Sequence, residues 1–227
     1  MAVVETERHG QIFIIRMNRP ERLNAMGREL MEALAEQWTL FHKDPDLEVA
    51  IFTGTGRGFC AGEDMKESLE EGSPTDPETT IDDPFMSQEL KKPVIAAING
   101  YAMGGGFMLV ERTDLRVASS NAIFEVSEAK RWLLGGYNHG TIANLPYPIA
   151  MEMALGFRFT AQRFYELGFL NRVVEPQKLI PTALEMGEHL LTLPPAARVN
   201  TVHMMRQIRP NTTKHQDLLA NALHQHG

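Results

Sequence analysis

Short apolar runs alternate along the chain with longer segments in which apolar residues recur at helical spacing. The apolar runs predict buried strands at residues 11–17, 49–54, 93–98, 115–119 and 171–175. The helical spacing predicts a helix within residues 26–42 and further helices near residues 105–113, 140–155 and 161–167. Because strand and helix alternate without a long linker, we expect one sizeable α/β domain built from βαβ units.

One segment departs from this pattern. Residues 68–84 combine acidic residues, serine and threonine with three prolines, which predicts a mobile loop.

Composition and charge narrow the class of protein. The 227 residues are 43% hydrophobic and 22% charged, which is typical of a globular domain with a real core. The net charge of −7 argues against a nucleic-acid surface, and no apolar run approaches the length of a membrane span. The single cysteine, Cys60, excludes an internal disulfide framework and is interpreted as a small buried side chain rather than a nucleophile. We therefore expect a cytoplasmic protein with neither nucleic-acid nor membrane partners.

Two glycine-rich turns carry the candidate chemistry. Gly104, Gly105 and Gly106 follow the predicted strand at 93–98 and precede a predicted helix, whose first N–H groups have no intrahelical partner. Upstream, the strand at 49–54 runs into a second glycine-rich turn that ends near Asp64. Two such turns can direct N–H groups at one carbonyl oxygen, as in an oxyanion hole. Phosphate binding and tight packing are the alternatives for glycine-rich turns of this kind.

A set of motifs extends beyond these turns. In chain order they are Asn18-Arg19-Pro20, Leu23-Asn24-Ala25-Met26, Phe59-Cys60-Ala61-Gly62 with Asp64, Lys92-Pro93 through Asn99-Gly100, Gly104-Gly105-Gly106, Asp114-Leu115-Arg116-Val117-Ala118, Phe124 with Ser127-Glu128, and Leu167-Gly168 with Asn171-Arg172-Val173-Val174. Over roughly residues 10–205 the chain thereby resembles the crotonase (enoyl-CoA hydratase/isomerase) superfamily.

The resemblance implies a fold and an assembly. It implies a crotonase-like ββα superhelix (ClpP/crotonase fold), with an acyl-CoA-binding core at residues 1–175 and a helical C-terminal region at 176–227 that is shorter than usual for the family. The substrate would be an acyl-CoA, so coenzyme A enters as part of the thioester. No covalently bound cofactor and no metal site are expected. The resemblance further implies a homotrimer or homohexamer, with Met151, Met153, Met204 and Met205 on late helices as candidate contact residues and intrachain packing as their alternative.

The resemblance also assigns roles to residues at the reacting centre. The backbone N–H groups of Glu63 and Gly105 map to the two donors of the oxyanion hole, and Glu128 maps to the acid–base carboxylate. The structural alternative for Glu128 is helix capping or an ion pair with Lys130 or Arg131.

Met108 is the main departure from the family pattern. Typical hydratases carry a second glutamate at this position, and a thioether can neither accept a proton from water nor orient it as a carboxylate does. Three groups are candidate replacements: Glu63, the turn residues Tyr137 and His139, and Glu111, which lies one helical turn after Met108 and for which outward exposure or pairing with Arg112 is the alternative.

Substrate binding is assigned to a further group of positions. Arg22 and Lys66 are the candidate partners of the CoA phosphates, and the backbone near Ala61 and Asp64 is the candidate contact for adenine. Gly104, Met108 and Gly136 complete the predicted substrate-binding set.

These observations predict an enoyl-CoA isomerase or hydratase with a single main glutamate. A hydratase-lyase or dehydratase acting on an aromatic or branched acyl-CoA is the first alternative. A catalytically silent acyl-CoA-binding homologue is the second.

Overall fold

The computed structural model of the protein describes residues 2–71, 82–131 and 145–209, and it contains two sheets. The larger sheet has six strands in the spatial order β1 (Val4–His9), β2 (Ile12–Met17), β3 (Val49–Gly54), β5 (Val94–Ile98), β7 (Leu115–Ser119) and β10 (Arg172–Val174). The smaller sheet has four strands in the order β4 (Gly58–Cys60), β6 (Tyr101–Met103), β8 (Ile123–Glu125) and β9 (Phe159–Thr160). In the larger sheet only β1 runs antiparallel to its neighbour.

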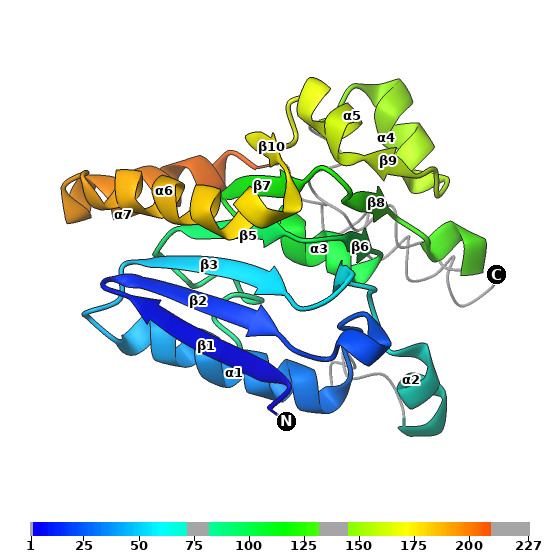
Figure 1. The fold of residues 1–227 in the computed structure, drawn as a ribbon, viewed down its shortest axis with the longest axis horizontal. Helices are drawn as coiled ribbons and strands as arrows, with labels where there is room; N and C mark the ends of the chain where they lie inside the picture. Colours follow the sequence, from blue (N-terminus) through cyan, green and yellow to red (C-terminus); the bar gives the residue numbers. More distant parts are fainter. Residues whose placement is uncertain (1, 72–81, 132–144, 210–227) are drawn as a thin grey trace.

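Helices cover both faces of the larger sheet (Figure 1). Helix α1 (Arg28–Lys43) lies on one face and α6 (Leu179–Leu191) on the other. The other described helices are α2 (Met65–Glu71), α3 (Gly105–Glu111), α4 (Tyr147–Ala154), α5 (Ala161–Glu166) and α7 (Pro195–Gln207). Short 3-10 turns lie at Pro20–Arg22, Glu128–Arg131 and Pro176–Lys178. The predicted α/β class is therefore confirmed.

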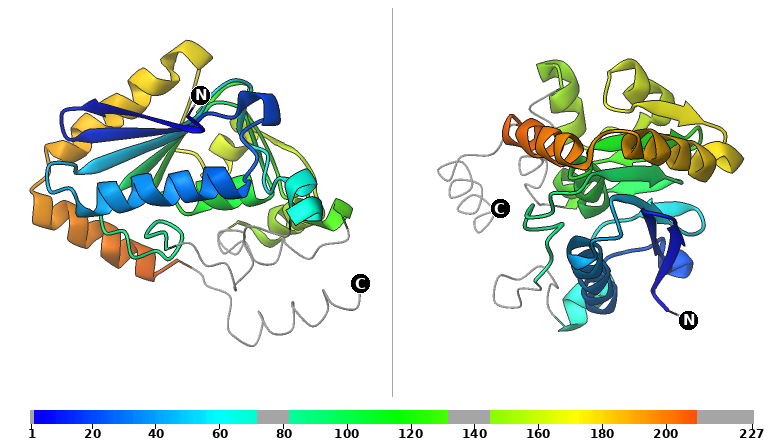
Figure 2. Two further views of the ribbon diagram at one scale, coloured as in Figure 1. Left: turned by 90° about the horizontal axis from the view of Figure 1, so that it is seen from below. Right: turned by 90° about the vertical axis from the view of Figure 1, so that its left-hand side faces the viewer.

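The alternation of side chains along β2 explains the layers. Phe13 and Ile15 face the core cluster that includes Trp38 of α1, whereas Ile12 and Ile14 face a second cluster that includes residues of α6. Successive side chains of a strand point to opposite faces, so a strand that is apolar throughout must be covered on both sides. Figures 1 and 2 accordingly show α1 and α6 on different sides of the sheet.

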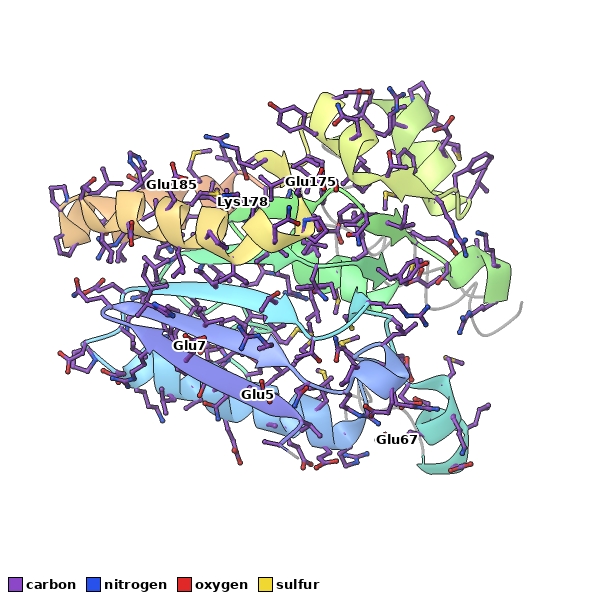
Figure 3. All side chains as sticks on the ribbon, viewed as in Figure 1. Glu5, Glu7, Glu67, Glu175, Lys178 and Glu185 are labelled. Atoms are coloured by element: carbon purple, nitrogen blue, oxygen red, sulfur yellow. The ribbon has the colours of Figure 1, made fainter. Side chains whose placement is uncertain are left out.

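Several elements were not expected from the sequence. The strands of the smaller sheet are only two or three residues long, too short to show periodicity. Strand β1 is exposed along almost all of its length and carries Glu5 and Glu7, labelled in Figure 3, so it lacks an apolar face.

The predicted mobile loop at 68–84 is wrong at its start, because helix α2 extends through residue 71. At its other end, the Asp83 carboxylate accepts the N–H of Phe85, whose ring stacks on Trp38 at 4.5 Å between centroids. Residues 72–81 lie outside the described ranges.

The C-terminal helices are joined firmly to the sheet. Gly187 of α6 lies so close to β2 that a Cβ there would be 2.9 Å from Cδ1 of Ile12. Near the end of α7, Arg206 contacts the Asp114 carboxylate at 2.6 Å, and Arg209 contacts it at 3.1 Å. Arg206 also donates to the carbonyl of Lys92. These bonds hold the end of α7 at the N-terminal ends of β5 and β7.

Candidate active site

The turn after β4 brings the first predicted donor into place. Gly62 has φ +88°, and a Cβ at this position would lie 2.9 Å from the Met103 carbonyl oxygen and 3.3 Å from the Gly105 nitrogen. Only glycine combines this backbone conformation with so close an approach. The turn at Gly62 therefore lies directly against the start of α3.

Backbone bonds fix the direction of the Glu63 N–H. Met26 N–H donates to Gly62 O at 2.8 Å, and Asp64 N–H donates to Met26 O at 3.0 Å. These bonds form a parallel bridge between Met26 and Glu63, in which the N–H of Glu63 points away from Met26. Among the described residues, the Glu63 N–H has no hydrogen-bond acceptor.

The second predicted donor is at the start of α3. Gly104 precedes the helix with φ 49° and ψ −121°, a conformation that side chains disfavour, and its carbonyl accepts the N–H groups of Phe107 and Met108. Gly105 is the first helical residue, so its N–H has no intrahelical partner, and the described part of the chain offers it no other acceptor. A Cβ on Gly105 would lie 3.9 Å from the Glu63 nitrogen. The two predicted donors are thus neighbours in space.

Glu128 lies beside this pair of donors. It begins the 3-10 turn after β8, its side chain is half-buried, and its Oε1 atom lies 3.1 Å from where a Cβ on Gly104 would be. Its Oε2 atom is inaccessible to solvent. The fold therefore brings together Glu63, Gly104, Gly105 and Glu128, although Glu63 and Glu128 are 65 residues apart in the sequence.

A second carboxylate near Glu128 is held by cations. Glu125 is buried and contacts Lys130 at 3.1 Å and Arg158 at 2.6 Å. Burial raises the pKa of Glu125, but the bonds from Arg158 and Lys130 outweigh it and leave that pKa below its ordinary value. Lys130, which the sequence offered as a partner of Glu128, contacts Glu125.

Met108 and Glu111 lie on α3 but in different surroundings. Met108 is half-buried and packs against the large core cluster one turn after Gly105. Glu111 is 6% exposed at the opposite end of the helix, so of the two alternatives offered for it, outward exposure is wrong. Its negative charge raises the pKa of Arg112, against the lowering effect of burial. Because Glu111 is at the far end of α3 from Gly105, the structure does not bring it to the donors.

The predicted CoA-binding residues around Asp64 already contact one another. Arg22 donates to both carboxylate oxygens of Asp64, at 2.5 and 3.3 Å, and Arg19 adds a bond at 3.3 Å. The bond from Arg22 lowers the Asp64 pKa. The N–H groups of Ala61 and Asp64 are bonded to the carbonyls of Leu23 and Met26, and Lys66 is exposed. Arg22 keeps 40% of its side chain exposed and can still meet a ligand.

Three predicted positions lie outside the described ranges: Gly136, Tyr137 and His139. Their roles, like those assigned to Glu128, Glu63 and Gly105, stay predictions.

The side chains of Glu63 and Cys60 have structural surroundings. Glu63 Oε1 accepts a 2.6 Å bond from the Ser68 hydroxyl of α2. Burial raises the pKa of the Cys60 thiol to about 12, so Cys60 is a neutral packing residue at physiological pH. Sequence reasoning did not assign a role to Ser68, and a lone serine in an acidic segment gives no signal for one.

Within the described ranges, no cluster of His, Cys, Asp and Glu side chains has the arrangement of a metal site. In the same ranges, no helix has the length and apolarity needed to cross a bilayer.

The sequence and the fold are both similar to those of known proteins. Residues 7–226 match the sequence profile of the family described as enoyl-CoA hydratase/isomerase. The enoyl-CoA hydratase EchA19 of Mycobacterium tuberculosis is 35% identical over 215 residues, which cover 87% of this chain and 80% of that protein. The (E)-benzylidenesuccinyl-CoA hydratase of Thauera aromatica is 36% identical over 85% of this chain and 77% of its own length. A crystal structure of an enoyl-CoA hydratase from Mycobacterium tuberculosis H37Rv superposes with a TM-score of 0.84 at 33% identity, covering 98% of this chain and 89% of that one.

Proposed function

Because the chain belongs to the enoyl-CoA hydratase/isomerase family, we propose that it catalyses proton transfer next to the carbonyl of an enoyl-CoA thioester, with Glu128 as the acid–base residue. The N–H groups of Glu63 and Gly105 hold the thioester oxygen in this proposal. The observation that supports it is the position of the Glu128 carboxylate, whose Oε1 lies against Gly104 at the start of α3.

The chemistry follows from these positions. Removing or adding a proton at the carbon next to a thioester carbonyl passes through an enolate, whose negative charge is on the carbonyl oxygen. Two N–H donors about 3 Å from that oxygen stabilise the charge as it develops, and losing one typically costs about a hundredfold or more in rate. A carboxylate beside the donors can exchange the proton with the carbon.

Hydration or dehydration is the reaction that the relatives favour, since both curated relatives described above are named hydratases. Addition of water bonds the water oxygen to the β carbon, moves the double-bond electrons to the thioester oxygen and finally places a proton on the α carbon. With Met108 uncharged, Glu128 both accepts the proton of the water and returns it. The name of the Thauera aromatica relative makes an aryl-substituted enoyl group the first alternative to a straight chain.

Double-bond isomerisation is the second candidate, and Met108 favours it. Moving a double bond between two carbons needs one carboxylate and no activated water, which matches a site with Glu128 and a thioether at position 108.

The test is turnover of 2-enoyl-, 3-enoyl- and aryl-enoyl-CoA thioesters by wild type and by Glu128→Gln. We expect Glu128→Gln to abolish turnover of the preferred thioester while its dissociation constant changes by less than about threefold, since the amide keeps the shape but cannot accept a proton. Glu125→Gln is the matched control: it removes a carboxylate three residues away that is bound to Lys130 and Arg158, and should lower thermal stability but retain turnover.

Unchanged turnover in Glu128→Gln would remove this residue from the mechanism. Tight thioester binding without turnover of any substrate class by the wild type would instead identify a silent acyl-CoA-binding homologue.

A further inference from the structure

The segment Leu23–Met26 contacts both turns that carry the proposed oxyanion donors. It follows the short turn Pro20–Arg22 and precedes α1, and it packs between the turn around Gly62 and the start of α3. Its side chains, those of Leu, Asn, Ala and Met, cannot act as acid–base groups, because none of them can transfer a proton. Its contacts with the two turns are therefore positional.

The segment is held in a demanding conformation. Leu23 has φ 51° and Asn24 has φ 57°, two consecutive left-handed residues that are not glycine. Each such residue costs about 1–3 kcal/mol and persists only where the surroundings impose it. The Asn24 side chain supplies that constraint: it is fully buried, accepts the Arg19 N–H at 2.8 Å, and donates to the carbonyls of Thr55 and Gly58 at 3.0 and 2.8 Å.

The left-handed pair fixes the turn that carries the first donor. Leu23 O accepts the Ala61 N–H at 3.0 Å, and the backbone of Met26 binds on both sides of Glu63. These three bonds set the position and direction of the Glu63 N–H, because the residues directly before and after it are bonded to the segment.

The side chain of Met26 reaches the second donor. It is 2% exposed, and its terminal Cε atom would be 2.4 Å from a Cβ built on Gly105. The Met26 methyl group thus fills the space that any side chain at the first residue of α3 would occupy. Met26 thus contacts both turns: its backbone bonds to Gly62 and Asp64 on either side of Glu63, and its side chain lies against Gly105.

We propose that Met26 is a positioning residue that sets the separation between the N–H groups of Glu63 and Gly105. The inference rests on the proposed function, because it assumes that these two N–H groups bind the thioester oxygen. Donors are effective only within about 2.7–3.1 Å of the oxyanion, so a shift of a few tenths of an ångström at one turn weakens the pair. Removing the methyl group releases α3 to approach the turn at Gly62.

The test compares Met26→Ala with Met31→Ala. Met31 lies on α1, belongs to the same core cluster and is 7% exposed, so Met31→Ala removes the same buried side-chain volume as Met26→Ala. We expect both variants to lose similar thermal stability, but only Met26→Ala to lose about tenfold in kcat, with KM within about twofold. Met26→Leu keeps the volume but ends one bond nearer the backbone, so it should fold normally and still lose part of kcat.

A rescue experiment separates positioning from general packing. Gly105→Ala keeps the N–H of residue 105 and places a methyl group where the Met26 methyl lies, so alone it should displace Met26 and lower kcat. In the Met26→Ala background the same substitution fills the space and should restore several-fold of the lost kcat. Such non-additivity is the mark of two groups that share one contact.

Infrared spectra of bound butanoyl-CoA, labelled with ¹³C at its carbonyl, provide a readout without turnover. Wild type should lower the carbonyl stretching frequency relative to free ligand, and Met26→Ala should lower it less. No shift in wild type would contradict the proposed oxyanion hole itself. A wild-type shift that persists in full in Met26→Ala, or an equal loss of kcat in Met31→Ala, would overturn the role of Met26.

Discussion

Met108 is the residue that most limits the chemistry of the site. Its thioether lies half-buried one turn into α3, close to the helix start where the donors meet. A thioether is a weak acceptor and does not titrate, so it can neither take a proton from water nor orient it through charge.

Restoring a carboxylate at this position should change the balance of reactions. We expect Met108→Glu to raise hydration of a 2-enoyl-CoA at least several-fold relative to isomerisation of a 3-enoyl-CoA, because a second carboxylate can hold and activate the water. Product analysis by chromatography measures both reactions in one sample, with Met108→Gln as the uncharged control of similar size. Rapid hydration by wild type, with no gain in Met108→Glu, would show that the water is already activated without a carboxylate at position 108.

Asp64 links protonation to stability. The bond from Arg22 lowers its pKa in the folded protein below the ordinary value of 3.8, so the folded state binds this proton less tightly than the unfolded state does. A lowered carboxyl pKa stabilises the fold fully above pH 3.8, and the contribution is lost as pH falls through the lower folded pKa.

We therefore expect the gap in unfolding free energy between wild type and Asp64→Asn to be largest near pH 7 and to narrow below pH 3.8. Urea unfolding across this pH range measures it, and Asp46→Asn, at an exposed carboxylate, provides the control. A difference in unfolding free energy that grows on acidification would contradict a lowered pKa of Asp64 in the folded protein.

At the scale of elements, the junction of α1 and α2 depends on one side chain. The Ncap of α1 is Gly27, which has no side chain to bind the first N–H groups of the helix. Glu67 of α2, labelled in Figure 3, supplies this bond instead: its Oε1 accepts the Arg28 N–H at 2.6 Å. One helix thus caps another, next to the turn from Gly62 to Asp64, which directly precedes α2 and is bonded to Met26.

Removing this cap should destabilise the protein measurably. We expect Glu67→Ala to lower the unfolding free energy by about 1 kcal/mol, the usual cost of a lost N-cap. Glu70→Ala, at an exposed position of the same helix, should stay within about 0.5 kcal/mol of wild type. Chemical denaturation of wild type, Glu67→Ala and Glu70→Ala measures these unfolding free energies. Equal losses in the two variants would show that capping by Glu67 contributes nothing to stability.

The sequence predicted the elements that bury long apolar runs. The predicted strands at 49–54 and 93–98 correspond to β3 and, to within one residue, to β5, because six and five buried residues in a row give a strong pattern. The cross-cap by Glu67 and the left-handed pair at Leu23 and Asn24 were beyond sequence reasoning. Both depend on hydrogen-bond partners from segments that are distant in the sequence, and the local pattern of apolar and polar residues does not indicate such contacts.

At the scale of the whole molecule, α7 leaves an apolar surface exposed. Met204, Met205 and Ile208 are 68%, 58% and 73% exposed, whereas Met153, which the sequence also offered as a contact residue, is fully buried within the chain. The intrachain alternative is thus correct for Met153. For the site as a whole, motif order grouped Glu63, Gly105 and Glu128, which the fold then placed together.

We expect the protein to form a trimer or a dimer of trimers that buries the apolar side chains of α7. Light scattering at micromolar concentration should give three or six times the mass of one chain. Met204→Asp combined with Ile208→Asp should lower that mass, because charges are poorly tolerated in a buried interface, whereas Leu40→Asp on α1 should not. A monomeric wild type that still turns over thioesters would separate assembly from catalysis.

The ion pairs of Arg206 and Arg209 with Asp114 form late when the protein folds during synthesis. The strands of the larger sheet lie side by side in the same order in which they occur along the chain. The sheet can therefore extend strand by strand as successive segments leave the ribosome. Asp114 directly precedes β7 of this sheet, whereas Arg206 follows it by 92 residues. At about 5–20 residues per second, synthesis of that interval takes about 5–20 seconds. During this time the Asp114 carboxylate lacks both Arg206 and Arg209, so the nascent sheet gains these contacts only when the end of α7 and Arg209 emerge.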